Sequence, residues 1–135
     1  MVGNPMLFQL REILDQHDRC RVECDGFIRI AAYVLEQAGI PFKVYTGYAY
    51  VRNADDTDDD LVNPHWWIEV QDEDDLTLTV DYRLRMWCGD HAPHGVFYAN
   101  DEYGIQYGDL PDSSLKVEVP DFKTSKQIFE ILTSL

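Results

Sequence analysis

Two residues of one predicted hairpin could supply two members of a catalytic triad. His65 begins the segment H-W-W-I-E-V, and Asp81 ends the segment L-T-L-T-V-D. A hairpin centred on Glu73 places His65 directly opposite Asp81, where paired Cβ atoms are roughly 4.5–5.5 Å apart. A carboxylate at that distance can hold an imidazole ring by a hydrogen bond, and a ring held in this way can act as a general base.

The apolar residues of the same hairpin support this register. On one face they pair Trp66 with Val80, Ile68 with Leu78 and Val70 with Leu76, and the other face carries His65, Trp67 and Glu69. A slip of one residue would turn the apolar set of one strand to water. Burial of the apolar face therefore enforces the pairing.

Cys24 is the candidate nucleophile of the triad. It begins a predicted helix over 24–38 that ends before Gly39 and Pro41, and the helix has one apolar stripe made of Phe27, Ile28, Ala31, Leu35 and Ala38. A thiol in the first helical turn lies beside unpaired N–H groups and the positive end of the helix dipole. These favour the reactive thiolate, and the stripe directs Cys24 toward the sheet that the helix covers.

The rest of the pattern predicts an α+β fold. We expect helices over 4–18 and 122–135, strands over 43–52, 65–70, 76–81 and 115–119, a short strand near 96–98, and an exposed acidic loop at 53–60. Helices beside an antiparallel sheet are typical of the α+β class. The 135 residues correspond to one domain, 1–135.

Composition excludes several function classes. The formal net charge of −14 argues against binding to nucleic acid, whose affinity comes from Lys and Arg, and against anionic membrane surfaces. The chain has no basic-then-apolar leader, and no apolar run approaches about 18 residues, so we expect neither a secretion signal nor a membrane span. The three cysteines fit reduced thiols in the cytoplasm, and a host-cell destination by a signal-less route stays open.

The combination of motifs resembles the transglutaminase-like superfamily, whose core is the papain-like cysteine peptidase fold. Its members typically have a Cys at a helix start, a G-I-P turn, a G-Y strand, the motif H-x-W-x-E-V, and an Asp at the end of the next strand. This chain has C-D-G-F-I-R-I-A-A-Y-V-L-E-Q-A-G-I-P-F-K-V-Y-T-G-Y from Cys24, H-W-W-I-E-V from His65 and T-V-D-Y from Thr79. The match lies within the core region 20–83.

The resemblance implies Cys24 as nucleophile, His65 as general base and acid, and Asp81 as the group that orients the ring. It also implies a protein or peptide substrate and acyl chemistry through a thioester: hydrolysis of a peptide or side-chain amide, deamidation, or transfer to an amine. The chain differs from the family at Glu23, where Gly is common. With Asp25, this places two carboxylates beside the thiol. Residues 84–135 match no motif of the family.

Other readings remain open at this point. A catalytically silent module that binds a protein partner through its acidic surface is the alternative function. Gln16 or the Trp67 indole could assist at an oxyanion or line a cleft. No cofactor is expected, and no metal. Cys88, His91 and His94 have metal-like spacing, but structural zinc usually needs four ligands, and a polar turn is favoured.

Overall fold

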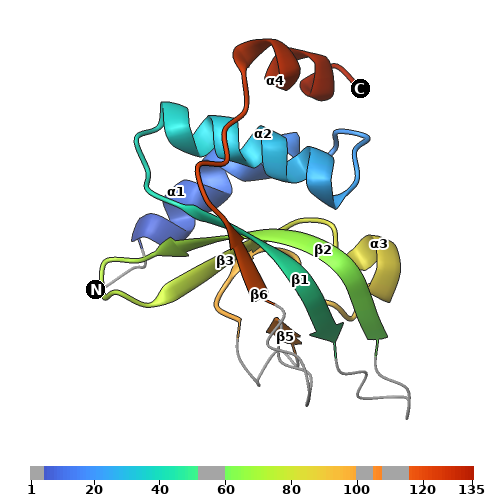
Figure 1. Ribbon diagram of the computed structural model, residues 1–135. Helices are drawn as coiled ribbons and strands as arrows, with labels where there is room; N and C mark the ends of the chain where they lie inside the picture. The colour runs from blue at the N-terminus through green and yellow to red at the C-terminus, as the bar shows by residue number, and fades with distance from the viewer. Residues whose placement is uncertain (1–4, 52–59, 100–104, 108–115) are drawn as a thin grey trace.

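Helices cover one face of an antiparallel sheet (Figure 1) in the computed structural model, which describes residues 5–51, 60–99, 105–107 and 116–135. The helical elements are α1 (Pro5–Leu14), the 3-10 turn η1 (Asp15–His17), α2 (Cys24–Gln37), α3 (Arg85–Cys88) and α4 (Lys126–Thr133). The strands are β1 (Lys43–Val51), β2 (Asp60–Gln71), β3 (Thr77–Asp81), β4 (Gly95–Phe97), β5 (Ile105–Tyr107) and β6 (Lys116–Val119). The predicted α+β class with an antiparallel sheet is confirmed.

The sheet has the strand order β4-β3-β2-β1-β5, and β6 also pairs with β1. Strand β1 pairs with β2 on one side, and on its other side it pairs with β6 and then β5. A bulge interrupts the β1–β2 ladder between Gly47 and Ala49. Gly47 pairs with His65 at this point, so the irregularity adjoins the candidate site.

Helix α2 forms where its apolar stripe predicts it. Phe27, Ile28, Ala31 and Leu35 are buried. At its C-terminus Gly39 has φ +72°, and the Ile40 N–H donates to the Leu35 carbonyl at 3.0 Å. This left-handed ending favours glycine, which has no Cβ to strain. The helix therefore stops before β1 and keeps its apolar face on the sheet.

The hairpin register predicted from the sequence is wrong by two residues. The structure pairs Ile68 with Val80, Val70 with Leu78 and Gln71 with Thr77. The Asp72 side chain accepts the N–H groups of Asp74 and Leu76, and the Asp72 N–H donates to the Leu76 carbonyl. The turn thus includes Leu76, which is exposed rather than paired with Val70. An even shift keeps every side chain on its predicted face, so His65 and Asp81 still share one.

Two apolar clusters lie on the two faces of the sheet. The larger one joins α1 and α2 to Val44, Ile68, Val80 and Val96. The smaller one contains Ala49, Val51, Val62, Leu84, Cys88, Ala92 and Phe97. The rigid sheet between these clusters carries His65 and Asp81.

Other boundaries differ from expectation. Helix α1 ends at Leu14 instead of residue 18, α4 begins at Lys126 instead of Phe122, and β2 begins at Asp60, well before His65. The short helix α3 and strand β5 had no periodic signal. Most of the predicted acidic loop 53–60, and residue 4 at the start of the predicted first helix, lie outside the described residues. Within the described part of the chain, no helix has both the length and the apolar character needed to cross a membrane.

Candidate functional site

Cys24 lines a cavity of about 530 Å³ at the N-terminus of α2. The other lining residues come from the start of α2, from β2 and from α3; they are Glu23, Asp25, Leu61, Val62, Asn63, Pro64, Trp66 and Trp87. Cys24 is half-buried, whereas Cys20 and Cys88 are buried. The thiol that the sequence selects is therefore the one that a substrate can reach from this cavity.

His65 and Asp81 form a buried pair behind the thiol. The Nε2 atom of His65 lies 2.7 Å from Oδ2 of Asp81, and their side chains are 0% and 1% exposed. The shifted register prevents the direct opposition that was predicted, but the shared face keeps the two side chains within hydrogen-bond range. The other carboxylate oxygen of Asp81 accepts the Arg83 N–H at 3.4 Å. Both oxygens are thus held, which fixes the carboxylate relative to the ring.

The pKa of His65 reflects this environment. Burial lowers the pKa. The charge and hydrogen bond of Asp81 raise the pKa by more than burial lowers it. Cys24 also raises the pKa through hydrogen bonding and charge, and the resulting value is about 10. The Asp81 pair therefore holds the ring in its imidazolium form at neutral pH.

The second ring nitrogen of His65 is available to the thiol. Because Nε2 binds Asp81, only Nδ1 is left, and this buried atom has no hydrogen bond of ordinary length and angle. Cys24 nevertheless acts on the ring strongly enough to raise its pKa. We interpret the sulfur as lying beside Nδ1 without a fully formed hydrogen bond. Such loose geometry is common in active sites without substrate.

The first turn of α2 offers unpaired donors beside the sulfur. The Glu23 residue that precedes the helix is extended, and no side chain caps the helix there. The first helical hydrogen bond runs from the Phe27 N–H to the Glu23 carbonyl at 2.9 Å. The N–H groups of Cys24, Asp25 and Gly26 are consequently not used by the helix. They form a patch of positive potential next to the thiol.

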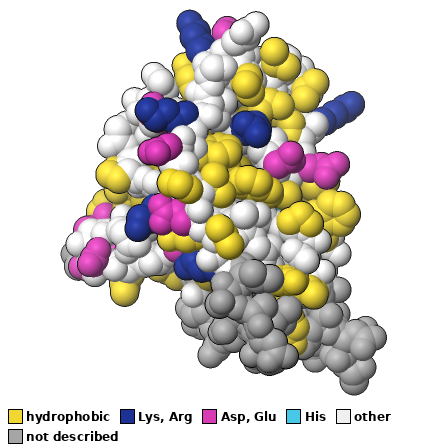
Figure 2. All heavy atoms as spheres, viewed as in Figure 1, with side chains coloured by type: hydrophobic (Ala, Val, Ile, Leu, Met, Phe, Trp, Pro, Cys, Tyr) yellow, Lys and Arg dark blue, Asp and Glu magenta, His cyan; other side chains and the backbone are white. Residues whose placement is uncertain are grey.

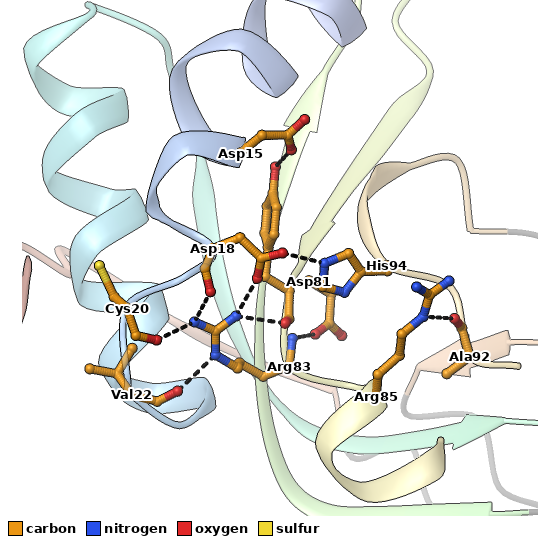
Figure 3. A network of polar contacts seen from close by, with 10 residues as sticks. Asp15, Asp18, Cys20, Val22, Asp81, Arg83, Arg85, Ala92 and His94 are labelled. Atoms are coloured by element: carbon orange, nitrogen blue, oxygen red, sulfur yellow. Dashed lines mark hydrogen bonds and ion pairs between the residues drawn. The ribbon is translucent and has the colours of Figure 1, made fainter. Parts of the chain in front are cut away.

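Arg83 ties the segment before Cys24 to the strand that carries Asp81 (Figure 3). Its Nε donates to the Val22 carbonyl at 2.7 Å, and its Nη2 donates to the carbonyls of Asp18 and Cys20, both at 2.9 Å. Its Nη1 binds the Asp18 carboxylate at 2.8 Å, and its Cζ atom lies 4.6 Å from the centre of the Phe27 ring. A planar guanidinium has five donors in a fixed fork, so one side chain can hold this loop in a single conformation.

Three further contacts extend this network. His94 binds the second oxygen of Asp18 at 2.7 Å, and the Tyr82 hydroxyl donates to Asp15 at 2.5 Å. Gly26 lets the loop close on the helix, because a Cβ there would meet the Cβ of Val22 at 2.8 Å. The loop and the first turn of α2 are therefore packed together as one unit.

A half-buried thiol, a buried imidazolium–carboxylate pair and free N–H donors are the groups that nucleophilic acyl chemistry needs. Comparisons of the chain with protein-family models, with curated proteins and with solved structures find no match.

Trp67 and Gln16 do not lie in the cavity. Trp67 is buried between the rings of Tyr45 and His65, and its Nε1 donates to Glu69 at 3.1 Å. It packs against the His65 ring, and its indole N–H is directed to Glu69. Gln16 is exposed, and its Nε2 donates to the Ile13 carbonyl at 3.3 Å. The structure therefore does not bring either residue to the position predicted for an oxyanion donor.

The residues with metal-like spacing have separate environments. Cys88 belongs to the smaller apolar cluster, His91 is exposed, and His94 binds Asp18. Among the described residues, no group of three or more His, Cys, Asp or Glu side chains has the arrangement of a metal site.

Four residues of the site were not identified from the sequence: Asn63, Trp66, Trp87 and Arg83. The alternating pattern assigned Trp66 to the apolar face, and it does pack against the core, but it also lines the cavity. Trp87 lies in the unpredicted helix α3 and is 55% exposed. Arg83 follows Asp81 closely in the chain, yet only the tertiary structure reveals its contacts with residues 18–22.

Proposed function

We propose that this protein is a cysteine-dependent acyl-transfer enzyme that hydrolyses a peptide or side-chain amide bond, built on a papain-like core of the transglutaminase-like kind. The observation that carries this proposal is the buried 2.7 Å pair of His65 and Asp81 beside a thiol that lines an open cavity. Burial of a charged pair costs several kcal/mol in general. A role in chemistry explains why the pair is retained beside the thiol.

The reaction begins with attack of the Cys24 thiolate on the amide carbonyl. A carbon–sulfur bond forms, and the carbonyl electron pair moves to oxygen as a tetrahedral oxyanion. When the oxyanion collapses, the carbon–nitrogen bond breaks and His65 gives its proton to the leaving amine. The product of this half-reaction is a thioester on Cys24, with His65 now neutral.

Water resolves the thioester in the second half-reaction. Neutral His65 removes a proton from water, the hydroxide oxygen bonds to the acyl carbon, and the sulfur leaves as thiolate. Asp81 remains ionised throughout and stabilises the ring when it is cationic. We favour hydrolysis over transfer to an amine because water needs no second binding site.

The oxyanion needs donors aimed at it. The unused N–H of Cys24 supplies one. Asn63 lines the same cavity and, of the described residues that do so, is the one with an amide side chain. We assign it the second donor role, in place of Gln16.

Labelling with a thiol-directed electrophile tests the nucleophile. We expect an iodoacetamide-type probe at neutral pH to modify Cys24 first, because Cys20 and Cys88 are buried and Cys24 lies beside the imidazolium. The Cys24→Ala variant should lose the label, as read by peptide mass spectrometry, whereas Cys88→Ala should keep it. Label that persists on Cys20 or Cys88 in the Cys24→Ala variant contradicts the assignment.

A binding module without turnover is the second candidate. Glu23 and Asp25 are exposed on either side of Cys24 in the chain, and their negative charges oppose formation of a thiolate close by. A pull-down that retains the same partner with wild type and with Cys24→Ala, and yields no cleaved product, would select this alternative.

A further inference from the structure

We propose that the Cys24 cavity selects substrates with a positively charged side chain, arginine or lysine, next to the scissile amide. This inference rests on the proposed amide hydrolysis and names its substrate class.

The charge of the cavity wall is the first argument. Glu23 and Asp25 both line the cavity and are exposed, and no Lys, Arg or His is among the lining residues that belong to the described part of the chain. Figure 2 shows acidic side chains over the right-hand end of α2, above hydrophobic side chains near α3. A cationic group placed there meets two carboxylates, and the His65 imidazolium behind the thiol is already paired with Asp81. An anionic group would be repelled by both.

The aromatic wall is the second argument. Trp66 and Trp87 line the same cavity as the two carboxylates, and Trp87 is 55% exposed although it is a large apolar side chain. An indole face attracts a guanidinium or ammonium group more strongly than other aromatic faces do. The aliphatic stem of Arg or Lys can also pack on the rings while its charge reaches Glu23 or Asp25.

The buried ring behind the thiol is the third argument, because it marks the cavity as a place where a ligand reacts. His65 is 0% exposed, and its Nδ1 atom, beside the Cys24 sulfur, forms no hydrogen bond of ordinary length and angle. A buried polar atom without a partner is costly unless something uses it. In the proposed reaction, the thiol and the leaving amide exchange a proton with this Nδ1 atom. The carboxylates of Glu23 and Asp25 and the indoles of Trp66 and Trp87 would then flank the point of reaction.

The nearby basic side chains do not neutralise this wall. Arg21, Arg83 and Arg85 line a different hollow of about 580 Å³, which shares only Glu23 with the Cys24 cavity. Arg83 is committed to the 18–22 loop, and the Nε of Arg85 donates to the Ala92 carbonyl at 2.8 Å. Among the described residues that line the Cys24 cavity, Glu23 and Asp25 are therefore the ones with carboxylate charges, and these three arginines are not among them.

Matched peptides test the proposal. Three peptide amides differ only in the residue before the scissile bond, which is arginine, its neutral isostere citrulline, or glutamate. We expect kcat/KM to be about tenfold higher for arginine than for citrulline, since each exposed charge pair contributes on the order of 1 kcal/mol or less. We expect glutamate to be the poorest, and the ratio to fall in high salt.

The double variant Glu23→Gln/Asp25→Asn should bring the arginine-to-citrulline ratio close to one. The control variant Glu36→Gln/Asp74→Asn removes the same charge from exposed positions outside the cavity lining and should keep the ratio. Equal turnover of the three peptides by wild type overturns the cationic preference but leaves amide hydrolysis standing. No turnover of any peptide, with Cys24 unlabelled, overturns both.

A second readout does not depend on finding a substrate. Cationic and anionic methanethiosulfonate reagents of similar size react with Cys24 at rates that report the local potential. We expect the cationic-to-anionic rate ratio to fall about tenfold in Glu23→Gln/Asp25→Asn relative to the control variant. An unchanged ratio means that the carboxylates do not act on ligands at the thiol, and the proposal fails.

Discussion

At the scale of single residues, the site depends on how Asp81 controls the His65 ring. Burial alone would lower the pKa of His65, and the carboxylate raises it to about 10. This balance was not predictable from the sequence, because it requires knowing that both side chains are almost wholly buried. The sequence did indicate the pair itself, since the residue types and the two-residue periodicity of the strands place His65 and Asp81 on one face.

The Asp81→Asn variant tests this control. Removing the charge leaves burial largely unopposed, so the ring pKa should fall from about 10 toward or below 6.5. The pH titration of the His65 ring, followed by NMR, measures this directly in wild type and variant. In wild type the alkaline limb of kcat/KM should lie near pH 10, where the ring loses the proton that it gives to the leaving amine. A ring that titrates near 6.5 in wild type contradicts the assigned pairing.

Asn63 is the residue to which we assign the second oxyanion donor, a role for which the sequence offered Gln16 or the Trp67 indole. Replacing Asn63 by Leu should lower kcat by roughly 10²–10³, the usual cost of losing one oxyanion donor. Labelling of Cys24 by a small electrophile should persist, since alkylation forms no oxyanion. The matched change Gln16→Leu should leave kcat unaltered, because Gln16 is exposed and bound to the Ile13 carbonyl. A large loss with Gln16→Leu would restore the original expectation.

At the scale of elements, the alternation of apolar residues predicted which face of the hairpin is buried but not which residues pair. The register depends on the turn, where Asp72 collects the N–H groups of Asp74 and Leu76 and moves Leu76 out of the strand. Helix α2 was predicted well because its stripe, first turn and Gly39 ending are all local signals. Helix α3 and the contacts of Arg83 were not predicted, because they depend on residues distant in the chain.

Arg83→Met should destabilise the protein by about 3 kcal/mol or more, because it removes the donor to four backbone carbonyls and to one oxygen of the Asp18 carboxylate. It should also slow labelling of Cys24 by freeing the loop that leads into α2. The control is Arg85→Met, which removes an exposed arginine with a single contact to the Ala92 carbonyl and should cost less than about 1 kcal/mol. Urea unfolding gives both free energies. Similar losses for the two variants would mean that Arg83 does not hold the loop.

At the scale of the whole molecule, a formal net charge of −14 surrounds a core that buries the His65 ring and the Arg83 guanidinium. Exposed acidic groups contribute a repulsion that salt screens, whereas the buried His65–Asp81 pair is screened much less. The contribution of surface repulsion to stability should therefore depend on salt, and the contribution of the His65–Asp81 pair should depend on pH. The acidity that argues against nucleic-acid binding also includes Glu23 and Asp25, on which the proposed preference for a cationic substrate rests.

The pH dependence of folding stability tests this view of the molecule. Because the His65 pKa in the folded state, about 10, lies above its ordinary value of 6.5, the folded state binds the proton more tightly. The stabilisation is fully present below pH 6.5 and is lost as the pH rises through about 10. The difference in free energy of unfolding between wild type and His65→Gln should therefore shrink, by an amount on the order of a few kcal/mol, between pH 6 and pH 10.

Urea unfolding at several pH values and two salt concentrations measures this difference. Salt should change both proteins equally, because surface repulsion is common to them. A difference that stays constant over this pH range would show that His65 is neutral in the folded protein, and the imidazolium that the proposed first half-reaction needs would be absent.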